Sequence, residues 1–229
     1  MEINVVGGNL RAVTFSADGK HVLSGDKGGV QVWRVEDRKQ TATMETRFVW
    51  CLAVSKDNRW IVVGTLWGDV HVWDVHTHEQ VWTHKQDFHA IRGVDFSPDS
   101  TRLTSASANC TAVVWDIATR EKVQTLHHKD PVISAKYSLQ GDRIATVYDS
   151  NDGCLLVDIK VGVTPRYNGL LWYNNHLLVI SDGKINQLEA STGSVISEWP
   201  LPDMRNSQCI AIPKHGKFIA YSVERTVTF

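Results

Sequence analysis

The feature that most constrains this chain is an internal repeat of about 40 residues. Four similar segments contain two apolar runs separated by a turn: VTFSADGKHVLSG, LAVSKDNRWIVVG, VDFSPDSTRLTSA and AKYSLQGDRIATV. They align on one apolar residue each, at intervals of 39, 42 and 41 positions: Phe15, Val54, Phe96 and Tyr137. Two weaker copies align on Trp172 and Ile212. A regular period of this length predicts stacked structural repeats.

A second landmark keeps the same period. The segments VQVWRV, VHVWDV and AVVWDI place a tryptophan at intervals of 40 and 42 residues, and LLVDI continues the series with Val157 in the tryptophan position. Runs such as AVTF and WIVVG are rich in β-branched and aromatic residues, which favour strands. The Asp, Gly and Pro residues between the runs favour tight turns. Each copy therefore predicts about four short antiparallel strands.

Repeats of this kind predict an all-β fold, a β-propeller of four-stranded antiparallel blades. A single blade exposes both faces, so stability is expected only when several blades stack. The approximate blades within one domain, 1–229, are 7–45, 46–86, 87–127, 128–166, 167–203 and 204–229.

The last repeat ends before a fourth strand. Residues 2–6 are therefore expected to add the outer strand beside TVTF at 226–229, because this pairing leaves no open sheet edge. It would close a ring of about six blades. An incomplete seven-bladed propeller is the alternative, and such an open ring is expected to self-associate.

The segments FSADGK, FSPDST, VHVWDV and AVVWDI resemble those of the WD-repeat propellers, and the resemblance, with degenerate repeats, covers essentially the whole chain. In that family a His, a Ser or Thr, a turn Asp and the Trp form a structural hydrogen-bond network. Trp33 and Trp73 occupy the tryptophan place of the first two copies. In the third copy the resemblance assigns the four places, with Asn where Asp is usual, to His89, Ser105, Asn109 and Trp115.

The charge balance limits which partners the protein is expected to bind, and the cysteines indicate the cellular compartment in which it is expected to reside. Lys and Arg number 24 against 25 Asp and Glu, a balance that predicts neither general nucleic-acid binding nor attraction to an anionic membrane. No apolar run approaches the roughly 20 residues that span a bilayer, and no signal peptide is recognisable. The cysteines show no metal-binding spacing and are expected to be reduced, which favours the cytoplasm or nucleus: Cys51, Cys110, Cys154 and Cys209.

The sequence favours no catalytic or metal chemistry. His76, His78 and His84 form the best metal candidate, but their segment aligns with a surface turn of the third copy, and a solvated turn is the preferred interpretation. Neither a nucleophile elbow nor a HExxH pair nor a phosphate-binding glycine loop is present. The acidic residues of the repeats fall in turns, where turn chemistry explains them. We therefore expect no cofactor and no enzymatic activity; a propeller hydrolase is the weaker alternative.

A propeller exposes one rim of loops that lead into its innermost strands. Counting back four residues from each aligned position gives Arg11, Trp50, Arg92 and Ile133, positions that in WD-repeat proteins commonly contact partners. Phe48 and Trp67 would extend this set into an aromatic patch flanked by arginines, and Trp and Arg dominate interface energetics. Packing of Trp50 between blades is the alternative, because Trp is mostly buried.

These residues predict a non-enzymatic scaffold that binds a protein or peptide on its rim. The partner would carry an acidic or phosphorylated residue beside an apolar one. A sensor or ligand-binding propeller belonging to a larger signalling protein is the alternative function.

Overall fold

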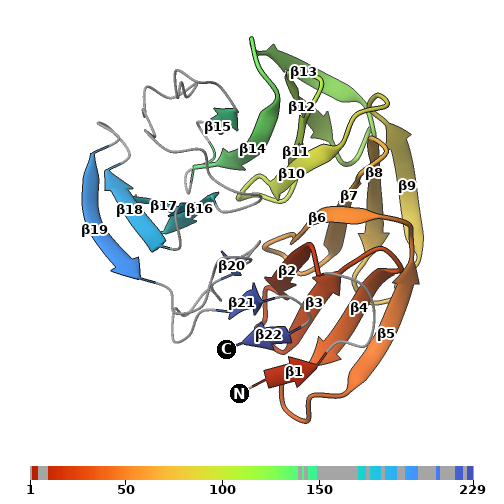
Figure 1. The fold of residues 1–229 in the computed structure, drawn as a ribbon. Helices are drawn as coiled ribbons and strands as arrows, with labels where there is room; N and C mark the ends of the chain where they lie inside the picture. The colour runs from red at the N-terminus through yellow and green to blue at the C-terminus, as the bar shows by residue number, and fades with distance from the viewer. Residues whose placement is uncertain are drawn as a thin grey trace.

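The computed structural model describes residues 2–4, 10–138, 141, 144–148, 170–173, 176–181, 184–189, 194–200, 210–211, 220–223 and 226–228. Every regular element within these ranges is a β-strand, and the strands form sheets that surround a common axis (Figure 1). The predicted all-β propeller is confirmed. Several positions used in the repeat alignment or cysteine analysis lie outside the described residues: residues 5–6, Cys154, Val157, Cys209 and Ile212.

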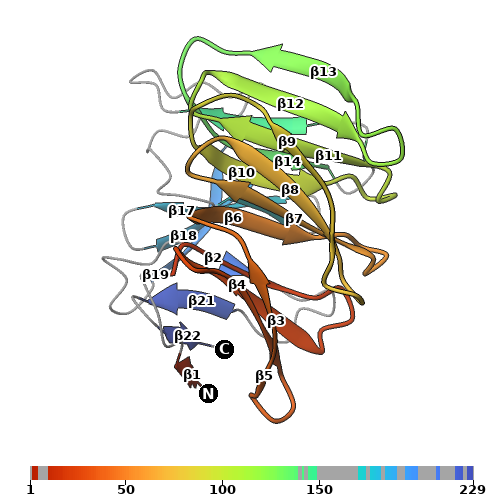
Figure 2. The ribbon, with the colours of Figure 1, turned by 90° about the vertical axis from the view of Figure 1, so that its right-hand side faces the viewer.

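Three complete four-stranded sheets follow one another in residues 12–127, each with its strands in chain order. The first contains β2 (Ala12–Phe15), β3 (His21–Gly25), β4 (Gly29–Arg34) and β5 (Gln40–Glu45). The second contains β6 (Val49–Val54), β7 (Trp60–Thr65), β8 (Asp69–Asp74) and β9 (Gln80–Lys85). The third contains β10 (Ile91–Phe96), β11 (Arg102–Ser107), β12 (Thr111–Asp116) and β13 (Lys122–His127). Figure 2 shows these sheets stacked side by side.

The described remainder of the chain adds three further sheets. A two-stranded sheet pairs β14 (Val132–Tyr137) with β15 (Ile144–Tyr148). The next sheet contains β16 (Leu170–Tyr173), β17 (His176–Ser181), β18 (Lys184–Glu189) and β19 (Val195–Pro200). The last contains β20 (Ile210–Ala211), β21 (Ala220–Val223), β22 (Thr226–Thr228) and, as its outer strand, β1 (Glu2–Asn4).

The two ends of the chain share this last sheet. β1 runs antiparallel to β22, with Glu2 opposite Thr228, Ile3 opposite Val227 and Asn4 opposite Thr226. Both strands lie close to the first sheet in Figure 1, and β20 and β21 contact β2. The expected pairing of the N-terminal segment with TVTF is therefore present. Without β1, the outer side of β22 would be an open row of backbone donors and acceptors.

The hydrophobic core lies between the sheets and alternates along each strand. In β7, Ile61 and Val63 pack into the cluster shared with the first sheet, whereas Val62 packs into the cluster shared with the third. All three side chains are buried. Successive strand residues point to opposite faces, so a strand covered on both faces is apolar throughout.

Hydrogen bonds also join neighbouring sheets at the end of the propeller where the first and second strands of each sheet are connected. We call this the turn end; its described turns include 16–20, 55–59 and 97–101. Asn58 and Ser100 occupy equivalent left-handed positions, with φ of 58° and 60°. Asn58 Oδ1 accepts from the Ala17 amide at 3.1 Å, and Ser100 Oγ accepts from the Asp57 amide at 3.3 Å. The turns thus fix the angular order of the sheets.

An ion pair links the inner strands of the third and fourth sheets. Lys136 Nζ lies 3.3 Å from Asp95 Oδ1, and the Tyr137 amide donates to Asp95 Oδ2 at 2.8 Å. Burial raises the pKa of the Asp95 carboxyl, and the opposing effects of Lys136 and the Tyr137 amide do not fully offset it. The pair therefore positions the two inner strands more than it stabilises them.

We predict that deletion of residues 1–4 lowers the thermal midpoint by roughly 5–10 °C, because a paired outer strand is worth several kcal/mol. The exposed edge of β22 should also cause concentration-dependent association. Calorimetry and light scattering measure the two effects. Glu2→Thr keeps the backbone ladder and is the control. A monomeric deletion variant with an unchanged midpoint would show that β1 does not close the ring.

A second prediction concerns the thiols. Burial raises the pKa of Cys51 to about 12, and the thiolate is the reactive species. In the folded protein at pH 8, iodoacetamide should alkylate Cys51 roughly 100-fold more slowly than half-buried Cys110. Peptide mass spectrometry measures the two rates, and urea should make them equal. Equal rates in the folded protein would contradict the buried position of Cys51.

Candidate functional site

The candidate site lies at the end of the propeller opposite the turn end, where connections 26–28, 46–48, 66–68 and 86–90 meet. We call this the rim. Arg11 precedes β2, and its amide donates to the Gly25 carbonyl at 2.9 Å. Its guanidinium carbon lies 4.7 Å from the ring centroid of Trp50 in β6. Both side chains are half-buried. A cation–π pair therefore bridges the first and second sheets at the rim.

Phe48 and Trp67 form a second aromatic contact in the second sheet. Phe48 has a φ of 54°, its amide donates to the Lys27 carbonyl at 3.1 Å, and its carbonyl accepts from the Leu66 amide at 2.9 Å. These bonds hold its ring edge-to-face against Trp67, with centroids 5.8 Å apart. Trp67 is 53% exposed. The backbone thus presents a large aromatic side chain to solvent in a fixed position.

Sequence reasoning missed Phe88, the most exposed of the large hydrophobic side chains in the described residues, at 83%. It stands in the connection between β9 and β10. Lys85 Nζ lies 5.0 Å from its ring centroid, 3.0 Å from the Trp67 carbonyl oxygen and 3.3 Å from Asp69 Oδ1. The available signal was an aromatic residue in the polar loop QDFHA, but counting back fixed intervals from Phe96 passes over it.

The two other expected rim positions, Arg92 and Ile133, differ from each other in burial. Arg92 in β10 is half-buried. Ile133 in β14 is only 5% exposed, so it belongs to the core, and the expectation of an exposed aliphatic rim residue is wrong. The reason is the close approach of β14 to β10. A Cβ at Gly93 would lie 3.0 Å from the Ile133 carbonyl oxygen, so the backbone of β14 lies directly against β10 at this position.

The third sheet contains the hydrogen-bond network that the family resemblance implied, with one exchange of residue. Trp115 Nε1 donates to Ser105 Oγ at 2.8 Å, and Ser105 Oγ donates to Gln86 Oε1. Gln86 Nε2 in turn donates to Thr111 Oγ1 at 3.3 Å. The place assigned to His89 is therefore taken by Gln86, three residues earlier. A glutamine side chain can both accept and donate there, as a histidine would.

His89 and Asn109 lie beside this network. Asn109 Nδ2 donates to Asp87 Oδ2, and the Ser107 hydroxyl donates to the same oxygen at 3.1 Å. The His89 side chain is 63% exposed, with Nδ1 3.4 Å from Asp87 Oδ1. Because the connection carries a carboxylate at Asp87, an amide at Asn109 can complete the contact as donor. The amide of Asn109 thus stands at the place where the family has an acid, and the carboxylate is supplied by Asp87 instead.

The equivalent tryptophans of the first two sheets differ from each other. Trp33 Nε1 donates to Ser24 Oγ at 2.9 Å. Trp73 is buried, and its Nε1 has no hydrogen-bond partner among the described residues. Val63 stands at the position equivalent to Ser24 and Ser105, so the acceptor is missing from the sequence itself.

Of the three histidines considered as metal ligands, His76 and His84 are exposed and His78 is half-buried. His76 and His78 lie in the turn between β8 and β9, and His78 has a φ of 56°. The ring of His84 lies 4.5 Å from the Trp115 ring. Burial, followed by Lys122, lowers the pKa of His84. Within the described ranges, no group of three candidate ligands could hold a metal ion.

Comparison with known proteins agrees with this geometry. The WD domain, G-beta repeat family matches residues 3–34, 38–74 and 78–116. The chain is 26% identical over 182 residues to WD repeat-containing protein 1 of Gallus gallus, covering 78% of this chain and 25% of that protein. It is 23% identical over 200 residues to protein groucho of Drosophila melanogaster, covering 84% of this chain and 27% of that protein. The chain spans about a quarter of the length of these curated relatives.

The fold has close counterparts among solved structures. The crystal structure of the RRP9 WD40 repeats superposes with a TM-score of 0.71 at 15% identity, covering 97% of this chain and 90% of that one. Stacked four-stranded sheets, two of them with a Trp–Ser hydrogen bond, form a β-propeller similar to these WD40 structures. Three repeats of the chain match the WD-repeat family model, and its fold is that of the WD40 propeller structures. In the part of the chain that is described, no helix has the length and apolar character needed to cross a membrane.

We predict that Ser105→Ala lowers the free energy of unfolding by about 1–3 kcal/mol, because it leaves the buried Trp115 Nε1 without an acceptor. Ser24→Ala is the matched control: its tryptophan, Trp33, is only half-buried, so water can replace the lost partner. Urea titration measures both values. If the two substitutions cost the same, the buried Trp115–Ser105 bond has no special role in the third sheet.

Proposed function

We propose that this protein is a non-enzymatic scaffold that binds a protein or peptide through the rim. The observation that carries the proposal is the adjacency of two contacts at the start of β6. Arg11 covers the Trp50 ring, and two residues earlier Phe48 supports the exposed Trp67. WD-repeat propellers generally act as platforms for protein interaction, which supports the same function.

The side chains of the rim define the chemistry of the partner. Trp67 and Phe88 offer exposed aromatic area, and Arg11 and Lys85 stand beside aromatic rings. Arg92, in the neighbouring inner strand, is the third cation of the proposed surface. This surface suits an apolar side chain next to a carboxylate or phosphate, because a guanidinium binds either group through two hydrogen bonds.

Preorganisation also supports binding at the rim. The backbone of Phe48 is bonded on both sides, the Trp67 amide donates to Thr65 Oγ1 at 3.3 Å, and Lys85 is bonded to the Trp67 carbonyl. Aromatic side chains have few rotatable bonds, so ordering them on binding costs little entropy.

The turn acids act as structural acceptors: Ser16 and Ser97 hydroxyls donate to Asp18 and Asp99, both at 2.6 Å. We propose a cytoplasmic or nuclear location, as expected from the scattered cysteines.

The test uses peptides selected from a random displayed library on the immobilised protein, followed by fluorescence anisotropy. We predict that selected peptides place an acidic residue beside an apolar one. Arg11→Ala and Trp67→Ala should each weaken their binding by about tenfold or more. Rim residues contact the peptide directly, so the thermal midpoint of Trp67→Ala should change little.

Trp199→Ala is the matched control, because Trp199 in β19 is also exposed, at 45%, but lies outside the proposed surface. It should leave peptide affinity unchanged. Selected peptides that bind Arg11→Ala and Trp67→Ala as tightly as the original protein would refute binding at the rim.

A further inference from the structure

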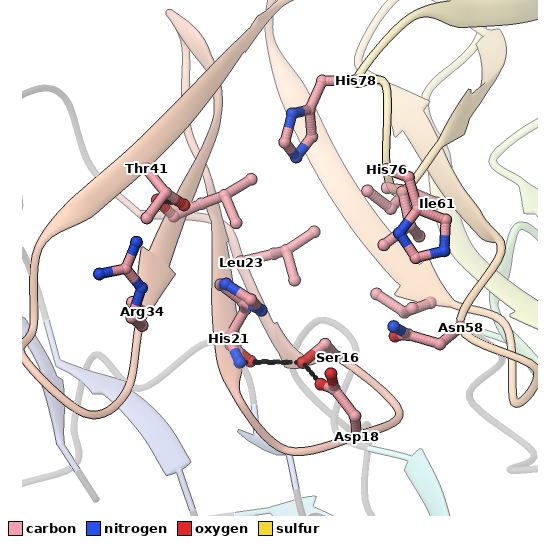
Figure 3. Close-up of a pocket in the computed structure, with 13 residues that line it drawn as sticks. Ser16, Asp18, His21, Leu23, Arg34, Thr41, Asn58, Ile61, His76 and His78 are labelled. Atoms are coloured by element: carbon pink, nitrogen blue, oxygen red, sulfur yellow. Dashed lines mark hydrogen bonds between the residues drawn. The ribbon is translucent and has the colours of Figure 1, made fainter.

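A cleft of about 280 Å³ lies between the first and second sheets at the turn end, on the opposite side of the propeller from the rim. Its volume is close to the lower limit for small-molecule sites. Figure 3 shows its labelled side chains around an open centre, with His21 and Arg34 on one side, His76 on the other and His78 above. The first wall comes from β3, β4 and β5, and the second from β6, β7 and the turn after β8.

The cleft is apolar where the two walls meet. Leu23 and Ile61 are 2% and 1% exposed, and Val54 and Val75 are half-buried beside them. These side chains can accept an aliphatic chain without breaking a hydrogen bond. The cleft is therefore amphiphilic, with an apolar base and polar walls.

The polar walls carry an excess of hydrogen-bond donors. Arg34, His21, His76 and His78 all line the cleft, and each imidazole has an N–H in either protonation state. Asp18 is the acidic residue among those that line it. Its Oδ1 already accepts from the Ser16 hydroxyl at 2.6 Å and from the Lys20 amide at 3.0 Å, so the turn itself occupies that oxygen.

Arg34 marks a departure from the repeat. The residue that follows the tryptophan is Asp74 in the second sheet and Asp116 in the third. Asp74 Oδ1 accepts from the His76 and Thr77 amides at 2.8 and 3.0 Å, and so holds its turn in shape. In the first sheet this position is a cation. Arg34 Nη1 instead lies 3.0 Å from Asp37 Oδ2, on an exposed pair, and further donors of the guanidinium can serve a ligand.

We propose that this cleft is a second binding site, for a small carboxylate with an aliphatic tail of about four to eight carbons, a size that fits the cavity volume. The carboxylate bonds to Arg34 and to the imidazole N–H groups, and the tail lies against Leu23, Ile61 and Val75. The exposed guanidinium of Arg34, at a position where the other repeats have an aspartate, favours a negatively charged ligand. The buried aliphatic residues determine its tail.

The site is tested by titrating hexanoate into the whole chain and following it by saturation-transfer NMR and by the imidazole resonances of His76 and His78. We expect a dissociation constant on the order of 1 mM, since a ligand of eight heavy atoms in an open cleft gains little more. Hexanol and hexylamine should bind at least about tenfold more weakly. Hexanoate without detectable binding, or hexylamine binding as tightly, would overturn the proposal.

Two variants separate binding from folding. Arg34→Asp restores the residue of the other repeats, so the thermal midpoint should be maintained while hexanoate binding is lost. Val75→Phe fills the cleft and should also abolish binding. Arg120→Asp is the matched control, because it makes the same charge change in the equivalent turn of the third sheet, away from the cleft. Unchanged hexanoate binding by Arg34→Asp would place the ligand elsewhere and refute this site.

Discussion

Mutual burial of neighbouring sheets is the interaction on which the whole structure depends. The strand Ile61–Val62–Val63 contributes alternate side chains to two separate apolar clusters, one on each side of its sheet. A sheet removed from the stack would expose both faces to water, at about 25 cal/mol for every square ångström of apolar area. The sheets therefore stabilise one another in pairs, and the stability of the fold is distributed around the ring.

The boundaries of the sequence repeat do not coincide with the boundaries of the sheets. One repeat contributes strands to two neighbouring sheets and so connects them through the backbone. Each family match begins in the outermost strand of one sheet and ends in the third strand of the next: residues 38–74 contain β5 together with β6, β7 and β8. The match at residues 3–34 begins in β1, which belongs to the last sheet. The ring is closed in the same way, because the first repeat contributes β1 to the last sheet and β2, β3 and β4 to the first.

Sequence patterns predicted the strands and the pairing of the two ends because both depend on periodicity and on satisfying an open edge, which are local or pairwise properties. Trp115 and Ser105 were placed in one network by the family resemblance, and they are joined by a hydrogen bond between β12 and β11. Gln86 and Phe88 were missed because connection lengths vary between copies, and no fixed interval locates a loop residue. Ile133 was misplaced for a different reason: its exposure depends on how closely β14 approaches β10, a property of two strands about 40 residues apart.

The shared last sheet also sets the order in which the ring can be completed during synthesis. β1 is synthesised long before its partner β22, and most of the described strands lie between them in the chain. Loop-closure entropy makes such a contact slow to form. Until β22 has been synthesised, β1 has no partner strand, and during that interval its edge is exposed to association with other nascent chains.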